Sequence, residues 1–195
     1  MSLSRRLGRA FLRAVEALDG PFGHLVERRL GRLYARVVFR GCARLGGVTA
    51  MGHVRVTGGA GIRLGDRTFF LDGLWPTELI CHPSGRLEVG EGNGFNYGVR
   101  IEARERVTVG NNCRFASGVR ISDSAAGVVA PVVIEDDVWI AHGARIGPGV
   151  TIGRGSIVSA GSVVTTSIPA DRVAIGNPAR SMPRSLVASV RPRAS

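Results

Sequence analysis

The chain has 195 residues, enough for one well-buried domain with an appended arm. Twenty-eight glycines and few aromatic residues indicate many tight turns rather than a core of large rings. The formal net charge of +11 is confined to the ends, because residues 1–44 carry ten arginines against three acids, residues 180–195 carry four arginines and no acid, and residues 45–179 carry twelve of each.

The composition also argues against several classes of protein. Cys42, Cys81 and Cys113 lie far apart without CxxC or CxH spacing, so we interpret them as small buried hydrophobic residues and predict no metal site. Arginines interleave with the apolar residues of the first 20 positions, and no uncharged run approaches the roughly 18 residues of a membrane span. We therefore expect a cytoplasmic protein without a cleaved signal peptide or a spanning helix.

Residues 1–44 are predicted to form a basic amphipathic helical arm. Apolar residues recur at helical spacing over 3–19 and again over 24–40, with arginines between them and Gly20-Pro21 separating the two helices. Their apolar faces either pack on the main domain or a neighbouring subunit, or make a peripheral contact with an anionic membrane surface. Nucleic acid is not expected as a partner, because the arm has neither interleaved aromatic residues nor a recognisable binding module.

Residues 45–180 are predicted to form one domain, and a six-residue repeat is clear in it over 109–164 and in an upstream stretch from 89. Every sixth position is aliphatic at Ile134, Ile140, Ile146, Ile152, Val158 and Val164, and the series continues upstream at Val109, Phe115 and Ile121 and at Val89, Phe95 and Ile101. We predict flat strands with one inward aliphatic each, three to a triangular coil of 18 residues, so that Ile140 stacks on Val158 and Ile146 on Val164. The prediction is an all-β solenoid, a parallel β-helix, followed by a short basic tail over 181–195.

The most specific stretches of the repeat are 131–153, 159–169 and the ending Gly-Asn-Pro-Ala-Arg at 176–180. They resemble the hexapeptide-repeat acyltransferases, and among these the branch that O-acetylates sugars. The resemblance implies a left-handed parallel β-helix, a homotrimer, and acetyl-CoA lying in the groove between two subunits.

The resemblance also implies which residues bind acetyl-CoA. Small turn residues would let the pantetheine chain approach backbone amides, and Arg180, assisted by Arg154 and Arg184, would lie near the CoA phosphates. The implied set is Trp139, Ala141, Gly143, Ser159, Ala160, Gly161, Asn177, Pro178, Ala179 and Arg180.

Acyl transfer needs a base that takes the proton of the acceptor, and histidine is the usual choice. In the sugar-acetylating branch this histidine stands in a run such as Ile-Ser-Asp-x-x-His-Gly, but here Ala126 occupies its position. Three accounts stay open: an engineered loss of the base, a natural variant in which another group or the substrate handles the proton, and a non-catalytic homologue that binds CoA or sugar. His142 is the best substitute base. Asp123 would orient a base or bind an acceptor hydroxyl, or is a plain turn residue.

The remaining histidines, His24, His53 and His82, are predicted to lie away from the turns that match the cofactor site. The leading hypothesis is a CoA-dependent O-acyltransferase, with acetyl as the expected group, acting on a sugar or another hydroxylated small molecule. Direct transfer in a ternary complex is expected, because no Ser-His or Cys-His pair is visible in the sequence. The alternative is a binding or scaffold protein that assembles through the prism and its arms.

Overall fold

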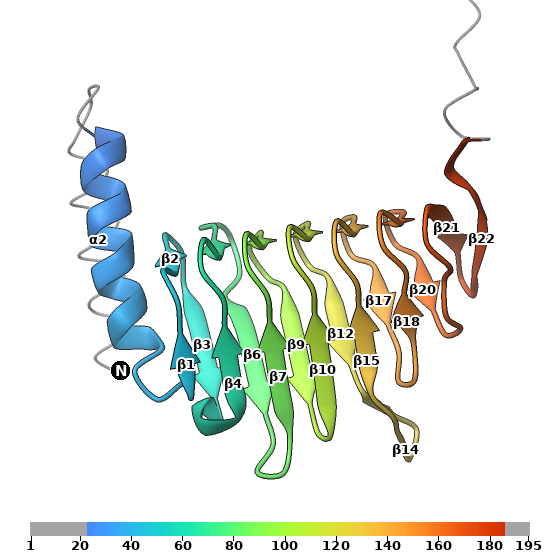
Figure 1. The fold of residues 1–195 in the computed structure, drawn as a ribbon, viewed down its shortest axis with the longest axis horizontal. Helices are drawn as coiled ribbons and strands as arrows, with labels where there is room; N and C mark the ends of the chain where they lie inside the picture. Colours follow the sequence, from blue (N-terminus) through green and yellow to red (C-terminus); the bar gives the residue numbers. More distant parts are fainter. Residues whose placement is uncertain (1–22, 186–195) are drawn as a thin grey trace, which may run out of the picture.

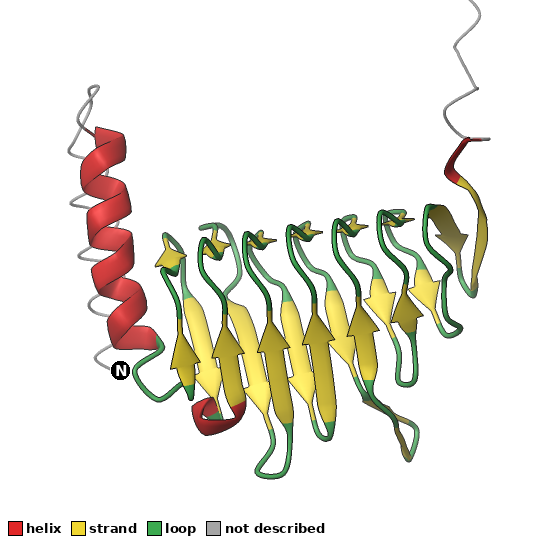
Figure 2. Ribbon diagram, viewed as in Figure 1, coloured by secondary structure: helices red, strands yellow, loops and turns green. Residues whose placement is uncertain are grey.

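Three parallel sheets wrap around a common core and form a solenoid with one α-helix at its N-terminal end (Figures 1 and 2). This computed structural model describes residues 23–185. The helix predicted over 3–19 and the end of the predicted tail lie outside the described residues. The predicted fold class, an all-β solenoid of the parallel β-helix type, is confirmed.

The chain visits the three sheets in turn, and we name them faces A, B and C. Face A contains β1 (Arg44–Leu45), β4 (Ile62–Leu64), β7 (Arg86–Val89), β10 (Arg106–Val109), β15 (Val132–Ile134) and β18 (Thr151–Ile152). Face B contains β2 (Thr49–Ala50), β5 (Phe69–Phe70), β8 (Gly94–Phe95), β11 (Arg114–Phe115), β16 (Trp139–Ile140), β19 (Ile157–Val158), β21 (Arg172–Gly176) and β22 (Ala179–Pro183). Face C contains β3 (Val54–Thr57), β6 (Thr77–Cys81), β9 (Arg100–Ala103), β12 (Arg120–Ser122), β17 (Arg145–Ile146) and β20 (Val163–Val164).

The register of these sheets is the one that the six-residue repeat predicts. Ile140 pairs with Val158 on face B, and Ile146 pairs with Val164 on face C. On face A, Ile134 pairs with Ile152, an offset of one 18-residue coil. Upstream coils are longer because extra residues enter at the corners, yet they keep the same inward positions. Each coil thus satisfies the backbone groups of the next and buries one aliphatic or aromatic column per face.

The N-terminal end of the core is closed by α2 (Gly23–Val38), the second of the two predicted helices. Tyr34, Ala35 and Phe39 are buried with the solenoid core. The ring of Phe39 lies 5.3 Å from that of Phe70 and continues the aromatic column of face B. α2 therefore packs on the main domain, one of the alternatives left open for the arm.

Three departures from the plain coil complete the architecture. β13 (Ser124–Ala125) and β14 (Val128–Val129) form an antiparallel hairpin that interrupts the repeat between β12 and β15. At the C-terminal end, β22 folds back antiparallel on β21, so the first residues of the predicted tail are part of face B. A short 3-10 helix, η1 (Gly59–Gly61), precedes β4. None of the described helices has the length and apolar character needed to span a membrane.

Candidate active site

Three turns that lead from face B to face C (116–119, 141–144 and 159–162) stack along one edge of the prism, and the turn of the β21–β22 hairpin (176–178), within face B, lies beside them. We name this edge the B–C corner. The amide of Gly143 donates to the carbonyl of Ser117 at 3.0 Å, and that of Gly161 donates to the carbonyl of His142 at 2.8 Å. Gly176 N–H donates to Ser162 Oγ at 3.2 Å. The three segments that the resemblance assigns to cofactor binding, 141–143, 159–161 and 177–180, thus converge on this corner.

The small residues of the B–C corner provide space rather than free donors. The amides of Ala141, Gly143, Ser159 and Gly161 all donate to carbonyls of neighbouring coils at 2.8–3.0 Å. A Cβ atom added to Gly143 or Gly161 would meet no atom within 4 Å, although their φ angles of 65° and 67° favour glycine. A thin ligand could therefore lie close to the backbone here, but these four amides are already engaged.

A serine and a histidine meet on the B–C corner. Ser117 Oγ lies 2.8 Å from His142 Nδ1, across 25 residues of sequence, and Ser117 is only 9% exposed while His142 is exposed. If Nδ1 carries the proton and donates it to Ser117 Oγ, the lone pair of Nε2 is left free to accept a proton. The pair therefore has the arrangement of an oriented general base.

His142 stands at the rim of a groove of about 510 Å³ that runs from the B–C corner onto face C. Trp75 forms part of its wall and is 60% exposed. Its lining carries a net positive charge, because the outward residues Arg100, Arg120 and Arg145 of three consecutive strands face a single acid, Glu78, which pairs with Arg100. The groove thus places the histidine beside a surface suited to an anionic or hydroxylated ligand.

On the other side of the corner, Trp139 projects from face B and is 51% exposed. It borders a smaller groove of about 210 Å³ that also contains Arg114. In the terminal turn, Asn177, Pro178 and Arg180 are exposed, and Ala179 is buried.

Two arginines suggested as helpers at the CoA phosphates lie elsewhere. Arg154 ion-pairs with Asp136 at 3.0 Å, and Arg184 Nη1 donates to the carbonyl of Gly155 at 3.1 Å. Both contacts are at the corner between faces A and B.

Asp123 is fully buried, and its carboxylate accepts hydrogen bonds from three successive backbone amides. Arg104 N–H lies 2.8 and 3.0 Å from the two oxygens, Glu105 N–H lies at 2.8 Å and Arg106 N–H at 2.7 Å. The side chain thus ties the turn between β9 and β10 to the coil above it. These contacts are those of a structural turn residue.

Ala126 lies at the tip of the β13–β14 hairpin, at the corner between faces C and A. It has φ 49°, and the next residue, Gly127, has φ 82°, as a two-residue I′ turn requires. Figure 1 shows this hairpin on the lower edge of the solenoid, whereas the strands of face B line the upper edge. Within one chain, Ala126 and the B–C corner therefore lie at opposite ends of face C.

The edge that carries the hairpin also holds a histidine paired with a carboxylate. His82 Nε2 lies 3.0 Å from Glu102, and Glu102 is also bonded to Arg100 at 3.1 Å. The hydrogen bond with His82, and then that with Arg100, lowers the pKa of Glu102. His82 follows β6, and Glu102 lies on β9, so the pair sits on earlier coils than the hairpin.

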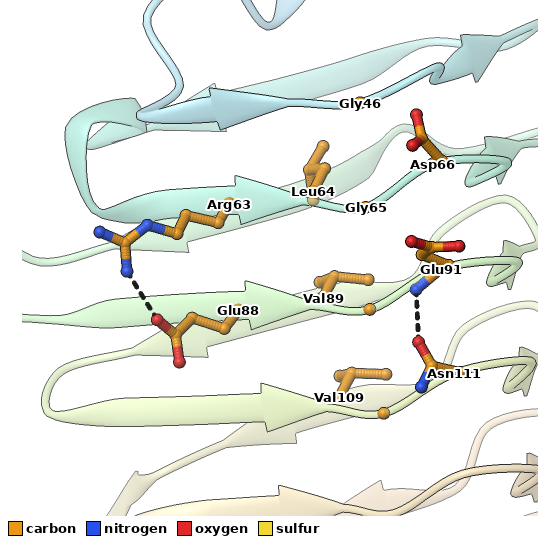
Figure 3. Close-up of a pocket in the computed structure, with 12 residues that line it drawn as sticks. Gly46, Arg63, Leu64, Gly65, Asp66, Glu88, Val89, Glu91, Val109 and Asn111 are labelled. Atoms are coloured by element: carbon orange, nitrogen blue, oxygen red, sulfur yellow. Dashed lines mark hydrogen bonds and ion pairs between the residues drawn. The ribbon is translucent and has the colours of Figure 1, made fainter.

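A third groove, of about 430 Å³, lies at the corner between faces A and B (Figure 3). Its polar side chains bond to groups of neighbouring coils: Arg63 pairs with Glu88 at 2.8 Å, and Asn111 Oδ1 accepts from the backbone N–H of Glu91 at 2.8 Å. Figure 3 shows these contacts bridging successive coils. Across residues 23–185, no cluster of three or more His, Cys, Asp or Glu residues could hold a metal ion.

Comparisons with known proteins agree with the repeat and the fold. Residues 131–166 match the family model for bacterial transferase hexapeptides (six repeats). No curated protein matches the chain. The solved maltose O-acetyltransferase of Clostridium difficile 630 is 25% identical, with a TM-score of 0.52 over 92% of this chain and 83% of that chain. A hexapeptide-repeat acetyltransferase of Vibrio cholerae is also 25% identical, with a TM-score of 0.52 over 92% and 89%.

A third solved structure is similar in fold. A mutant of AntD, an N-acyltransferase from Bacillus cereus, in complex with dTDP-4-amino-4,6-dideoxyglucose and coenzyme A, is 18% identical, with a TM-score of 0.64 over 76% of this chain and 89% of that chain. The resemblance to hexapeptide-repeat acyltransferases predicted from the sequence is thus confirmed: the chain is a hexapeptide-repeat β-solenoid whose solved neighbours include acetyltransferases.

Sequence reasoning missed two features of this site. Ser117 was not identified, because its contact with His142 crosses an irregular insertion that hides the register. The arginines on face C were hidden in a chain rich in arginine. Their position in the repeat could have identified them as outward residues of face C, because Arg120 and Arg145 each directly precede an inward-facing residue, Ile121 and Ile146.

Proposed function

We propose that the protein is a CoA-dependent acyltransferase that transfers an acyl group, with acetyl the expected one, to a hydroxyl of a sugar or another small acceptor. Support comes from the hexapeptide match and from two acetyltransferases at 25% identity. The convergence of residues 141–143, 159–161 and 177–180 on the B–C corner supports acetyl-CoA binding there. Exposed Trp139 and Arg180, and the open space beside Gly143 and Gly161, fit a long thin cofactor with charged ends.

The observation that carries the proposal is the hydrogen bond between Ser117 Oγ and His142 Nδ1 at the rim of the face C groove. With Ser117 holding the Nδ1–H tautomer, Nε2 of His142 removes the proton of the acceptor hydroxyl. The acceptor oxygen attacks the thioester carbonyl, the C–S bond breaks, and the imidazolium returns the proton to the departing CoA thiolate. Ser117 is here a positioning residue, so direct transfer is retained and no acyl-serine forms.

We further propose that the working unit is a homotrimer. The resemblance implies a homotrimer with acetyl-CoA between two subunits. In one chain the hairpin that carries Ala126 lies at the opposite end of face C from the cofactor corner, so this hairpin can reach that corner only from a neighbouring subunit. Packing the hairpin edge of one chain near the B–C corner of the next would bring them together. Size-exclusion chromatography with light scattering should give three times the mass of the chain, and a monomer at micromolar concentration would contradict the trimer.

The base is tested by free-CoA release, with maltose and dTDP-4-amino-4,6-dideoxyglucose as trial acceptors. His142→Ala should lower kcat by about 10²–10⁴, the usual contribution of a general base. Ser117→Ala should lower kcat less and shift the acid limb of the pH profile, and the matched control Ser84→Ala should change neither. If His142→Ala retains full turnover while Ala126→His raises it, the base belongs at position 126 and this chain is an inactivated form.

The second candidate function is a non-catalytic CoA- or sugar-binding or scaffold homologue. It is favoured by one observation, the alanine at the tip of the hairpin. Acetyl-CoA binding without CoA release from the unmodified chain or from Ala126→His, across a wide acceptor panel, would support it over the transferase.

We also propose a cytoplasmic location with peripheral contact to anionic membranes through the arm. α2 exposes Arg32 and Arg36 together with Leu33 and Val37, which are 56% and 47% exposed. The charge-reversing double variant Arg32→Glu/Arg36→Glu should lose co-sedimentation with phosphatidylserine vesicles. Equal sedimentation of the variant and the unmodified chain would reject membrane contact through α2.

A further inference from the structure

The outward column of face C changes its charge pattern halfway along the solenoid. In register, the column reads Arg55, Glu78, Arg100, Arg120 and Arg145. Glu78 pairs with Arg55 at 3.3 Å and with Arg100 at 2.7 Å, and Arg100 also reaches Glu102. The first three residues of the column, Arg55, Glu78 and Arg100, are thus ion-paired within the sheet.

Arg120 and Arg145 lack such neutralisation. Among the side chains that the structure describes, no carboxylate lies within 4.0 Å of either guanidinium. They occupy adjacent parallel strands, roughly 4.8 Å apart, where like charges repel and destabilise the pair. A bound anion would relieve this repulsion, and the described part of the chain does not supply one.

Location distinguishes this pair from other arginines of the solenoid. Arg63 and Arg67 are matched by acids on the next coil, at 2.8 and 3.0 Å. Arg86 and Arg106 are also register neighbours without an acid, but none of the described grooves includes them. Only the Arg120 and Arg145 pair lies in a groove that also contains His142.

We infer that Arg120 and Arg145 bind a phosphoryl group of the acceptor, so that the substrate is a phosphate or diphosphate ester rather than a neutral sugar. The inference rests on the proposed function, because it takes His142 as the group that receives the acceptor proton. Two guanidiniums side by side present the parallel N–H donors that phosphate oxygens accept in bidentate fashion. The nearby rim of the groove then holds the hydroxyl to be acylated.

The test is a calorimetric titration of the full chain with inorganic pyrophosphate, carried out with CoA present at saturation so that the CoA site is filled. Pyrophosphate should bind, and Arg120→Gln and Arg145→Gln should each weaken it by about tenfold or more. The matched control Arg63→Gln, an exposed arginine of face A, should leave binding unchanged. Parallel titrations with inorganic phosphate distinguish a monoester from a diphosphate acceptor, since the tighter probe identifies the class.

Three results would overturn the inference. One is pyrophosphate affinity that the two substitutions leave unchanged. Another is malonate binding as tightly as pyrophosphate at equal ionic strength, which would assign the pair to carboxylates. The third is a tenfold loss of acetyl-CoA affinity in Arg120→Gln or Arg145→Gln, which would assign the pair to the CoA phosphates. If acetyl-CoA fails to bind the unmodified chain, the proposed function fails, whereas pyrophosphate binding without CoA still reports on the anion site.

Discussion

Replacing Asp123 by asparagine tests whether this residue, in the segment that interrupts the repeat, has a structural role or a catalytic one. The carboxylate is fully buried and accepts four contacts from the amides of residues 104–106, at 2.7–3.0 Å. Asparagine has nearly the same shape but one acceptor oxygen. Its NH₂ group would face N–H donors that now bond to the carboxylate.

The expected loss can be worked from these contacts. A hydrogen bond to a charged group contributes about 1.5–3 kcal/mol, and a buried amide left without a partner costs about 1–3 kcal/mol. The asparagine side chain would keep one or two of the bonds and leave at least one amide unsatisfied. We therefore expect Asp123→Asn to lower the free energy of unfolding by about 3 kcal/mol. For a chain of this size that corresponds to a fall in Tm of roughly 6–12 °C.

Thermal and urea unfolding followed by circular dichroism measure this loss. The matched control is Asp137→Asn, which removes the same charge from an exposed turn position with φ 59° that asparagine tolerates. The control should change stability by no more than about 0.5 kcal/mol. An Asp123→Asn protein with unchanged Tm but lost CoA release would refute the reasoning and give Asp123 a catalytic role.

Three further predictions concern the core and its titrating groups. Phe95→Ala should destabilise by about 3–5 kcal/mol in urea unfolding, because the ring is buried and stacks at 4.9 and 4.6 Å on Phe70 and Phe115; a loss under about 1 kcal/mol would contradict the stack. Burial raises the pKa of Cys113 to about 11, so a thiol reagent at pH 8 should label it only after unfolding, and rapid native labelling would argue otherwise. The pKa of Glu102 is lowered on folding, so its stabilisation is present above the ordinary carboxyl pKa and is lost as the pH falls through the lowered value. The Tm difference between the unmodified chain and Glu102→Gln should therefore shrink below about pH 4, and a constant difference would count against the pairing of Glu102 with His82 and Arg100.

The sequence predicts the regular part of this molecule well, for a physical reason. A strand that must present one aliphatic inward on each of three sides repeats every six residues, so the pairs Ile140 with Val158 and Ile146 with Val164 follow from counting. The same counting places turns 141–143 and 159–161 on one corner. Their hydrogen bonds then follow from the stacking of coils.

The irregular parts could not be predicted in this way. The Ser117 and His142 contact spans 25 residues because the β13–β14 hairpin lengthens that coil, and no fixed period locates the partner. Asp123 has its role only because the turn at 104–106 lies beneath it. Whether an arginine of face C is neutralised depends on the residue one coil away, which is Glu78 beside Arg55 and Arg100 but arginine beside Arg120 and Arg145.

The most direct test of the acyltransferase account is a calorimetric titration of acetyl-CoA into the full chain and two variants. Ala160→Trp fills the B–C corner, and Ala170→Trp makes the same change at an exposed position before β21. The account predicts saturable binding to the unmodified chain and to Ala170→Trp, with at least tenfold weaker binding to Ala160→Trp. Absence of heat at millimolar acetyl-CoA, or equal binding by all three proteins, would contradict cofactor binding at the B–C corner.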